Sequence, residues 1–285
     1  MIKSYKARRV ISNTLIYILL GGLGLIWVSP LVYLILHSFR AEGLSTVNYL
    51  IPQQFSFQNY IDLFTVTGSG TNFPKWFLNT FIVAIFSCII STLAVLMVSY
   101  SFSRMRFKAR KPLINVGMIL GMFPGFMTMI AIYYLLKAMG LTQTLLALVI
   151  CYSAGAGLGY QISKGFFDTI PRALDEAATI DGATRNQIFW KIILPMSKPI
   201  IVYTVLTSFI GPWCDFILAK IIMGTAIDNY TVAIGLQNML APGKSLTQYK
   251  MFLAGSVVVA VPITILFLIM QRYYVEGVTA GGVKG

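Results

Sequence analysis

Long apolar runs alternate with short polar stretches along this chain, and the runs predict membrane-spanning helices. A helix needs about 20 apolar residues to cross about 30 Å of hydrocarbon. Six runs reach or approach that length, at residues 14–36, 78–102, 113–136, 144–161, 199–219 and 251–270. Hydrophobic residues make up 57% of the 285 and charged residues only 11%, which is typical of a polytopic membrane protein. We therefore predict an all-α fold with six transmembrane helices in one transmembrane domain, residues 1–285, whose core bundle covers about 75–272.

The first apolar run follows a basic N-terminus, as in a secretory signal. The run is about 23 residues long, whereas the apolar region of a signal has about 7–15, and no clear small-residue cleavage site follows it. We interpret residues 14–36 as an uncleaved first span.

The basic residues predict the orientation, because Lys and Arg are retained in cytoplasmic loops. Sixteen of the 22 fall on one side of the six predicted spans, together with both termini. Residues 103–111 and 165–198 are then cytoplasmic, and 38–77 and 220–250 lie outside. The net charge of +13 is explained as an orientation signal at an anionic membrane surface, without nucleic acid. The predicted location is the cell membrane, with several passes and both termini cytoplasmic.

Residues suited to catalysis, metal binding or nucleotide binding are scarce. His37 is the single histidine, and Cys88, Cys151 and Cys214 lie in predicted spans without C-x-x-C spacing. The glycines before Lys284 do not form a phosphate-binding loop, because the Lys is displaced and no Ser or Thr follows it. We expect no catalytic residue, no metal site and no cofactor in this chain.

The most charged stretch of the second half, DEAATIDGATRNQIFWKIILPMSKP, begins at residue 175 between two apolar runs. Pro171 suits the first turn of a helix, and acidic residues early in that helix suit its dipole. Gly182 suits a helix end, Thr184-x-x-Gln187 forms a capping box, and a second helix is expected to end at Leu194, just before Pro195. Alanines make the first helix thin on one side, so another protein could approach closely.

These residues also carry a resemblance. Glu176-Ala-Ala, three residues, Gly182, nine residues and Ile192-x-Leu194-Pro195 resemble the signature of binding-protein-dependent ABC importer permeases. The resemblance implies that the cytoplasmic loop of about 165–198 contains a coupling helix, which sits in a cleft of a separate ATPase subunit. The implied ATPase-docking residues are Asp175, Glu176, Ala177, Ala178, Asp181, Gly182, Ile192, Leu194 and Pro195. The alternative is an amphipathic helix that lies on the inner leaflet.

The C-terminal tail, residues 271–285, resembles that of the smaller permease subunit of maltose and maltodextrin importers, particularly as found in Gram-positive bacteria. Stretches at 168–171, 230–235 and 261–266 do so as well. The resemblance implies that Thr279, Ala280, Gly281 and Gly282 contact the ATPases, although a glycine-rich end is also typical of a frayed terminus.

The same resemblance implies the partners. They are a second homologous permease chain, two ATP-binding cassette ATPase subunits that bind ATP and Mg²⁺, and an extracellular sugar-binding protein. The implied substrate is an oligosaccharide, maltodextrin first, with raffinose-type or multiple sugars as alternatives. A self-sufficient secondary carrier or a membrane enzyme would be a different class of protein. The carrier predicts an inverted repeat or paired intramembrane charges, and the enzyme predicts a catalytic cluster.

Two further groups bear on transport. Three glycines recur every four residues, at Gly117, Gly121 and Gly125, and predict one small-residue face on which another helix packs. That packing is either a moving contact or a static one, and it lies beside the helix breaker Pro124.

In the fifth span, Trp213 and Asp215 are candidates for the translocation pathway. Trp213 would stack on a sugar, and Asp215 is an ionisable residue at a depth that is costly in lipid. Alternatively, both are interfacial anchors. The resemblance implies that the other permease chain makes most sugar contacts.

Overall fold

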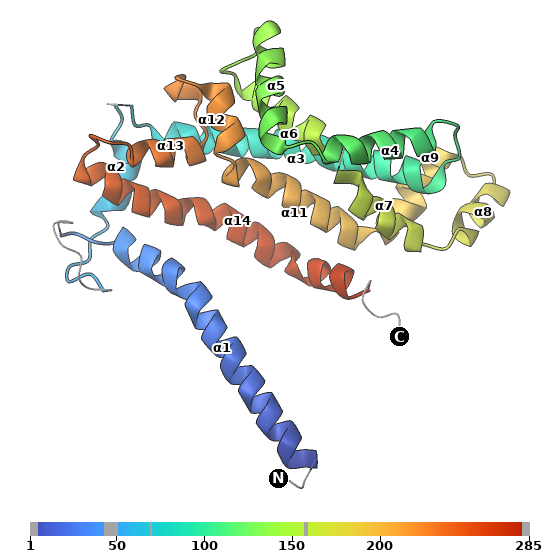
Figure 1. Cartoon of the computed structure of the whole chain (residues 1–285), viewed down its shortest axis with the longest axis horizontal. Helices are drawn as coiled ribbons and strands as arrows, with labels where there is room; N and C mark the ends of the chain where they lie inside the picture. The colour runs from blue at the N-terminus through green and yellow to red at the C-terminus, as the bar shows by residue number, and fades with distance from the viewer. Residues whose placement is uncertain (1–4, 43–50, 69, 157–158, 281–285) are drawn as a thin grey trace. The chain divides into compact units, whose positions relative to one another are not determined.

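The structure, a computed structural model, describes residues 5–42, 51–68, 70–156 and 159–280 (Figure 1). Within these residues the regular structure is helical, apart from two isolated β-bridges, so the predicted all-α fold class is confirmed. The chain divides into two compact units. Residues 1–66 with 239–258 form the first unit, and residues 67–238 with 259–285 form the second.

The elements, in chain order, are α1 (Tyr5–Ser38), α2 (Gln58–Thr65), α3 (Phe73–Arg104), α4 (Arg110–Gly121), α5 (Gly125–Ala138), α6 (Leu145–Ala156), α7 (Tyr160–Thr169), α8 (Ala173–Ile180), α9 (Arg185–Gln187), the π-helix η2 (Ile188–Ile193), α10 (Leu194–Met196), α11 (Lys198–Cys214), α12 (Ile217–Met223), the 3₁₀-helix η3 (Ile227–Asn229), α13 (Val232–Met239) and α14 (Leu246–Ala280).

In the described part of the chain, three helices are long and apolar enough to cross a membrane: Arg9–Ser38, Phe73–Arg104 and Leu246–Arg272. Three further pairs of helices, α4 with α5, α6 with α7, and the helix of Arg185–Met196 with α11, meet the same test when each pair is taken together. The number of spans is therefore three, or up to six if each bent pair is one span, which accommodates the six predicted runs.

The predicted run 113–136 is not one straight helix. α4 and α5 meet at 101° around Pro124, whose missing N–H and fixed φ prevent the helix from continuing. Gly117 and Gly121 lie on α4, whereas Gly125 begins α5, so the three glycines do not form one face, and that prediction is wrong. A Cβ added at Gly121 or Gly125 would meet nothing within 4 Å in this chain.

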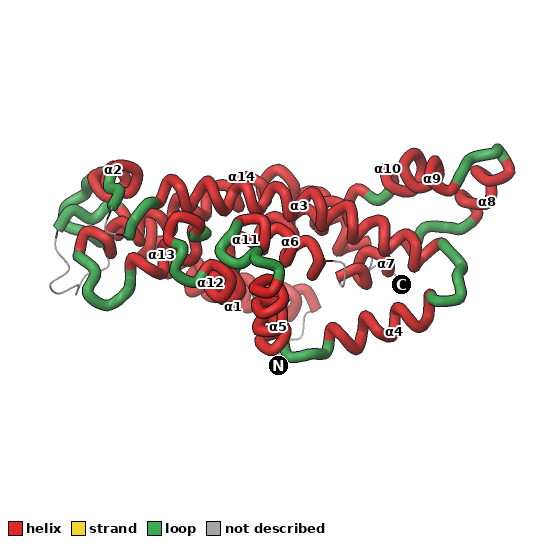
Figure 2. The backbone as a smooth tube through the Cα atoms, turned by 90° about the horizontal axis from the view of Figure 1, so that it is seen from above, coloured by secondary structure: helices red, strands yellow, loops and turns green. Residues whose placement is uncertain are grey.

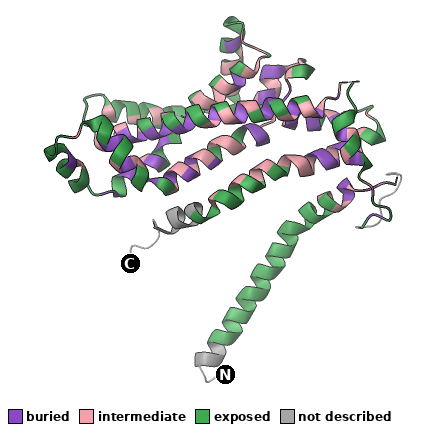
Figure 3. Ribbon diagram, turned by 180° about the vertical axis from the view of Figure 1, so that it is seen from behind, coloured by how far each residue is buried: buried purple, intermediate pink, exposed green. Residues whose placement is uncertain are grey.

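In the first unit, the side chains of α1 from Arg9 to Tyr33 are all exposed, as expected of a helix surrounded by lipid (Figure 3). At the end of α1 the chain becomes buried. The Asn59 amide on α2 donates to the carbonyls of Ser38 and Arg40, both at 2.9 Å.

In the second unit, α3 is the central helix and packs against α6, α7 and α11 (Figure 1). Its buried face contains small hydroxyl residues such as Ser87, Ser91 and Ser99. Small residues allow neighbouring backbones to approach closely, and the hydroxyls bond across helices: Ser99 Oγ donates to the carbonyl of Tyr160 at 3.0 Å. This packing fixes the C-terminal end of α3 beside the charged loop.

Candidate functional site

The charged loop folds as a helix, an elbow and a second helix, as predicted (Figure 2). Gly182 has φ +81°, a conformation that glycine adopts without strain, and it ends α8. The capping box is complete: Gln187 N donates to Thr184 Oγ1 at 3.3 Å, and Thr184 N donates to Gln187 Oε1 at 2.7 Å. Pro171 precedes α8, which begins at Ala173, so it does not occupy the first turn as predicted.

The second helix does not end at Leu194. It continues to Met196 and is wound as a π-helix over Ile188–Ile193. Pro195 would crowd the carbonyl four residues earlier in an α-helix, and the wider π turn accommodates it. The chain then bends by 85° at Ser197 into α11, and Ser197 Oγ donates to the carbonyl of Ile193 at 2.6 Å.

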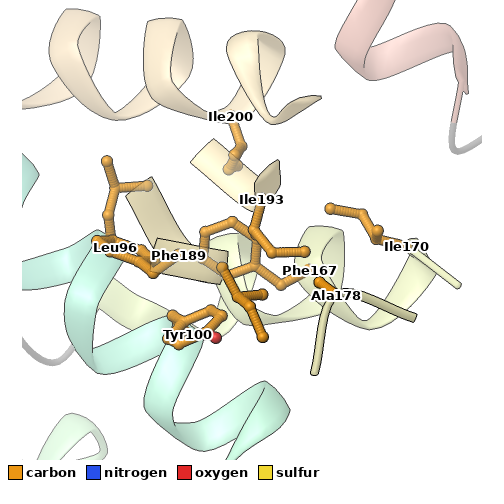
Figure 4. Close-up of a cluster of buried hydrophobic side chains, with 9 residues drawn as sticks. Leu96, Tyr100, Phe167, Ile170, Ala178, Phe189, Ile193 and Ile200 are labelled. Atoms are coloured by element: carbon orange, nitrogen blue, oxygen red, sulfur yellow. The ribbon is translucent and has the colours of Figure 1, made fainter. Parts of the chain in front are cut away.

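An apolar cluster lies beneath the loop and joins it to α3, α7 and α11 (Figure 4). Tyr100 of α3 is central to it, with its ring centroid 4.8 Å from that of Phe189. The loop therefore packs on the bundle as part of its hydrophobic core. The buried members of the cluster are Leu96, Tyr100, Phe167, Ile170, Ala178, Ile188, Phe189, Ile193 and Ile200.

Arg104, the last residue of α3, holds the start of the loop in place. Its Nη1 lies 2.9 Å from Asp175 Oδ2 of α8, and its side chain is only 5% exposed. Its Nη2 donates to the carbonyls of Phe167 and Ile170, each at 2.7 Å. One planar guanidinium thus joins α3 to α8 and to the end of α7, a fork geometry that Lys cannot reproduce. We call these four residues the Arg104 junction.

A second polar contact lies beside this junction. Ser103 Oγ donates to Asp168 Oδ1 at 2.6 Å, and Lys164 Nζ lies 2.6 Å from Asp168 Oδ2. Partial burial raises the pKa of the Asp168 carboxyl, but the hydrogen bonds from Lys164 and Ser103 outweigh burial and leave the pKa below its ordinary value. Asp168 therefore stays charged and fixes α7 to the end of α3.

The two sides of α8 differ in exposure. Asp175 and Ala178 face the bundle, whereas Glu176, Ala177 and Ile180 are exposed, and Ile180 is 86% exposed. Asp181 and Gly182 at the elbow are exposed as well. α8 thus presents small and apolar side chains outward, with carboxylates beside them, and this side can accept another protein. Among the predicted docking residues beyond the elbow, Ile192 and Leu194 are partly buried against the cluster and Pro195 is exposed.

Sequence reasoning missed two residues of this site. The charge pattern indicates only an orientation role for Arg104, although its place at the end of an apolar run, with an acid in the facing loop, is a signal for such a junction. The predicted docking residues do not include Ile180, although it lies three residues after Ala177 and so shares its side of the helix.

Both candidates for the translocation pathway make packing or hydrogen-bond contacts within the second unit. Trp213 is 2% exposed, and its ring packs against those of Phe77, Phe81 and Phe209, so it offers no open face to a sugar. Asp215 accepts a hydrogen bond from the Tyr152 hydroxyl at 2.7 Å and another from Leu218 N at 3.2 Å.

Asp215 thus accepts a hydrogen bond from the first turn of α12 and fixes Tyr152. Within the described residues, no three His, Cys, Asp or Glu side chains gather as they would around a metal ion.

The predicted tail contacts are only partly described. α14 continues to Ala280, past the expected span end at 270, so Thr279 and Ala280 are its last residues. Gly281 and Gly282 lie outside the described residues.

Comparison with known proteins gives consistent likenesses. Residues 91–279 match the family described as binding-protein-dependent transport system inner membrane component. The galactooligosaccharides transport system permease protein of Bacillus subtilis (strain 168) is 34% identical over 286 residues, with 100% of both chains covered. The maltodextrin transport system permease protein of Streptococcus pneumoniae is 33% identical over 286 residues, again with 100% of both covered.

The maltose/maltodextrin transport system permease protein of Escherichia coli (strain K12) is 33% identical over 298 residues, with 99% of this chain and 98% of that one covered. Among solved structures, a bacterial ABC transporter involved in the import of the acidic polysaccharide alginate matches 96% of this chain and 99% of that chain with a TM-score of 0.81, at 20% identity. This last likeness concerns the fold alone.

Proposed function

Because the chain belongs to the family of binding-protein-dependent transport system inner membrane components, it is a multi-pass inner-membrane permease of an ABC sugar importer, and we propose that its substrate is a maltodextrin. A permease subunit moves its substrate without changing it chemically, so the chain is not an enzyme. Likeness over nearly the whole chain to two permeases named for maltodextrin supports this substrate.

A galactooligosaccharide is the second candidate substrate. The permease of Bacillus subtilis named for that substrate is as similar to this chain as the maltodextrin permeases are. Both candidates are neutral oligosaccharides of hexoses, so the overall chemistry of recognition is shared, and the difference lies in the linkage and in the hydroxyl pattern of the ring. The other alternative, a self-sufficient secondary carrier, does not agree with membership of a binding-protein-dependent family.

The observation on which the coupling role rests is the two-sided exposure of α8. Its inner side is anchored to the bundle through Asp175 and Ala178, while Glu176, Ala177 and Ile180 face outward. A short helix that is fixed on one side and apolar on the other is suited to transmit a push from a docked protein. We assign α8 as the coupling helix, which docks in a cleft of an ATPase subunit.

The complete importer then contains this chain, a second homologous permease, two ATPase subunits and an extracellular sugar-binding protein. ATP and Mg²⁺ bind to the ATPase subunits. With both termini cytoplasmic, the residues from Thr279 to Gly282 would reach the ATPases from the end of α14.

Coupling can be traced through the described contacts. When the ATPases close, α8 moves with them, and the Arg104 junction passes that movement to the ends of α3 and α7. The cluster around Tyr100 moves as one packed body, because closely packed protein interiors transmit displacement instead of absorbing it. The helices that surround the transport pathway then rearrange and open outward.

Reconstitution tests the proposal. The chain is co-expressed with its sister permease, the ATPase and the binding protein, and membrane vesicles are assayed for ATP-dependent uptake of labelled maltotriose and of a labelled galactooligosaccharide. Uptake of maltotriose with stimulation of ATP hydrolysis supports the proposal. Uptake of the galactooligosaccharide alone would transfer the assignment to the second candidate, and uptake of neither, with all partners present, would contradict it.

A further inference from the structure

A cavity of about 280 Å³ lies in the second unit, between α3, α6, α7 and α11. Its polar lining consists mainly of hydroxyl groups, and none of its lining side chains is charged. Three of these hydroxyls belong to Tyr152, Thr207 and Ser208.

This lining matches a neutral sugar ring. Hydroxyls both donate and accept hydrogen bonds, as a sugar's own hydroxyls require, and the tyrosine rings offer apolar faces to the C–H side of a pyranose. An ion would require charged or carbonyl ligands, and a lipid acyl chain would leave the Ser208 hydroxyl without a hydrogen-bond partner. Pockets for drug-sized ligands measure about 300–1,000 Å³, so a cavity just below this range suits one ring of an oligosaccharide.

One wall of the cavity is held rigid. The Tyr152 hydroxyl donates to Asp215 Oδ2 at 2.7 Å, and Asp215 Oδ1 in turn accepts from Leu218 N. The aromatic face is therefore fixed before any ligand arrives, which reduces the entropic cost of binding.

The wall formed by α11 differs. Thr207 Oγ1 bonds to carbonyls of its own helix at 2.9 and 3.1 Å, whereas Ser208 Oγ has no hydrogen-bond partner within the described residues. Ser208 is therefore available to a ligand.

We infer that this cavity is a subsite in which this permease chain itself binds one neutral hexose ring of the transported oligosaccharide. Asp215 is a positioning residue that acts through Tyr152 and does not touch the sugar. The inference rests on the proposed function, since it concerns the substrate of the same transporter, but it goes beyond that function because it assigns direct sugar contact to this chain.

Gly211→Leu tests the subsite by filling it. Gly211 lines the cavity, and a Cβ added there meets nothing within 4 Å, so the longer side chain enters the open space without striking the backbone. Gly22→Leu on α1 is the matched control, because it adds the same side chain to a membrane helix with equal clearance. Uptake is measured in the complete transporter with maltotriose and with a galactooligosaccharide, at saturating binding protein, together with stimulated ATP hydrolysis.

We expect Gly211→Leu to lower uptake by about tenfold or more, because the added side chain occupies the space that the sugar ring would fill, while Gly22→Leu transports normally. Stimulated ATP hydrolysis should persist, because α8 and the Arg104 junction are unaltered. If the unmodified transporter imports one of the sugars and Gly211→Leu imports it equally fast, the subsite is refuted and the proposed function stands. If the unmodified transporter imports neither sugar, the proposed function itself fails.

A second measurement detects binding without depending on transport. In a chain whose three cysteines are replaced by alanine, Ser208→Cys is labelled with a small thiol reagent in the assembled transporter, with and without the sugar that it imports. Sugar should slow the labelling at position 208, because a ring bound in the cavity covers that side chain. Labelling that is unaffected by saturating sugar would overturn the inference even if Gly211→Leu fails to assemble.

Discussion

Removal of the Arg104 guanidinium should loosen the charged loop, including α8, from the bundle while leaving the membrane spans intact. The side chain is 5% exposed and makes an ion pair at 2.9 Å and two hydrogen bonds at 2.7 Å. Arg104→Ala leaves the Asp175 carboxylate without its ion-pair partner, and it leaves the carbonyls of Phe167 and Ile170 without these donors.

The magnitude follows from these contacts. Removing one partner of a buried charge pair typically costs about 3–5 kcal/mol. Asp175 is 22% exposed, so water recovers part of that cost, and we place the loss near the lower end, at about 3 kcal/mol. Local opening of α8 then becomes more than about 100-fold more frequent, since each 1.4 kcal/mol is a factor of ten. Arg104→Lys should recover only part of this loss, because a point charge cannot bond two carbonyls and a carboxylate in one fork.

The assay is hydrogen exchange of the α8 amides in the assembled transporter, together with the ratio of sugar transported to ATP hydrolysed. Arg106→Ala is the matched control, since Arg106 is exposed and two residues away. We expect faster exchange in α8 and a lower ratio in Arg104→Ala, with exchange in the middle of α3 unchanged. If exchange in α8 equals that of the Arg106→Ala control, the Arg104 junction does not anchor the loop.

Two other substitutions test the elbow and the orientation. Gly182→Val places a β-branched residue at φ +81°, with strain of about 1–3 kcal/mol, and should uncouple transport while membrane insertion persists; normal uptake would show that the elbow tolerates a side chain. The control is Gly165→Val in α7, where an added Cβ also has open space. Thr184→Cys, in a chain otherwise free of cysteine, should react with an impermeant thiol reagent only in inside-out vesicles, and reaction from outside in sealed cells would invert the predicted topology.

The sequence predicted the local features of this molecule well, because local chemistry determines them. Apolar runs located the membrane helices, Thr184-x-x-Gln187 located the second helix of the loop, and Gly182 marked a positive φ. Spacing alone failed where the backbone departs from a regular α-helix, as at Pro124 and Pro195. A stripe every four residues assumes an unbroken α-helix, and those prolines sit at a bend and beside a π-helix.

Contacts between segments that are far apart in the chain could not be predicted from the sequence. Arg104 and Asp175 are 71 positions apart in the sequence, and their pairing depends on how α3 and α7 pack. Trp213 has the composition of a sugar-binding residue, yet its burial is decided by Phe77, Phe81 and Phe209, which come from two different helices. Whether such a residue lies in the hydrophobic core or in a binding site depends on how the helices pack, and a single sequence does not record that packing.

The central claim is that α8 couples ATP hydrolysis on a partner subunit to sugar import, and charge reversal at Glu176 tests it most directly. Glu176 is exposed beside Ala177 on the outward side of α8, so its substitution leaves the bundle and the Arg104 junction intact. If the carboxylate meets a basic group in the ATPase cleft, its loss costs about 2–5 kcal/mol of association, and a like charge costs no less. Asp228→Lys is the control, a charge reversal at a carboxylate that is 77% exposed on η3 and whose ion pair with Lys75, at 3.0 Å, is a surface pair of about 0–1 kcal/mol.

The measurement is capture of the ATPase subunits by the detergent-solubilised permease pair, together with maltotriose uptake by the same variants. Glu176→Lys should insert and pair normally, but capture should fall about 30-fold or more, and uptake should be lost, while Asp228→Lys retains capture. A helix that only lies on the inner leaflet would gain about 1 kcal/mol of attraction to anionic lipid from the added Lys and would transport normally. Unchanged capture and unchanged uptake in Glu176→Lys would therefore contradict the account.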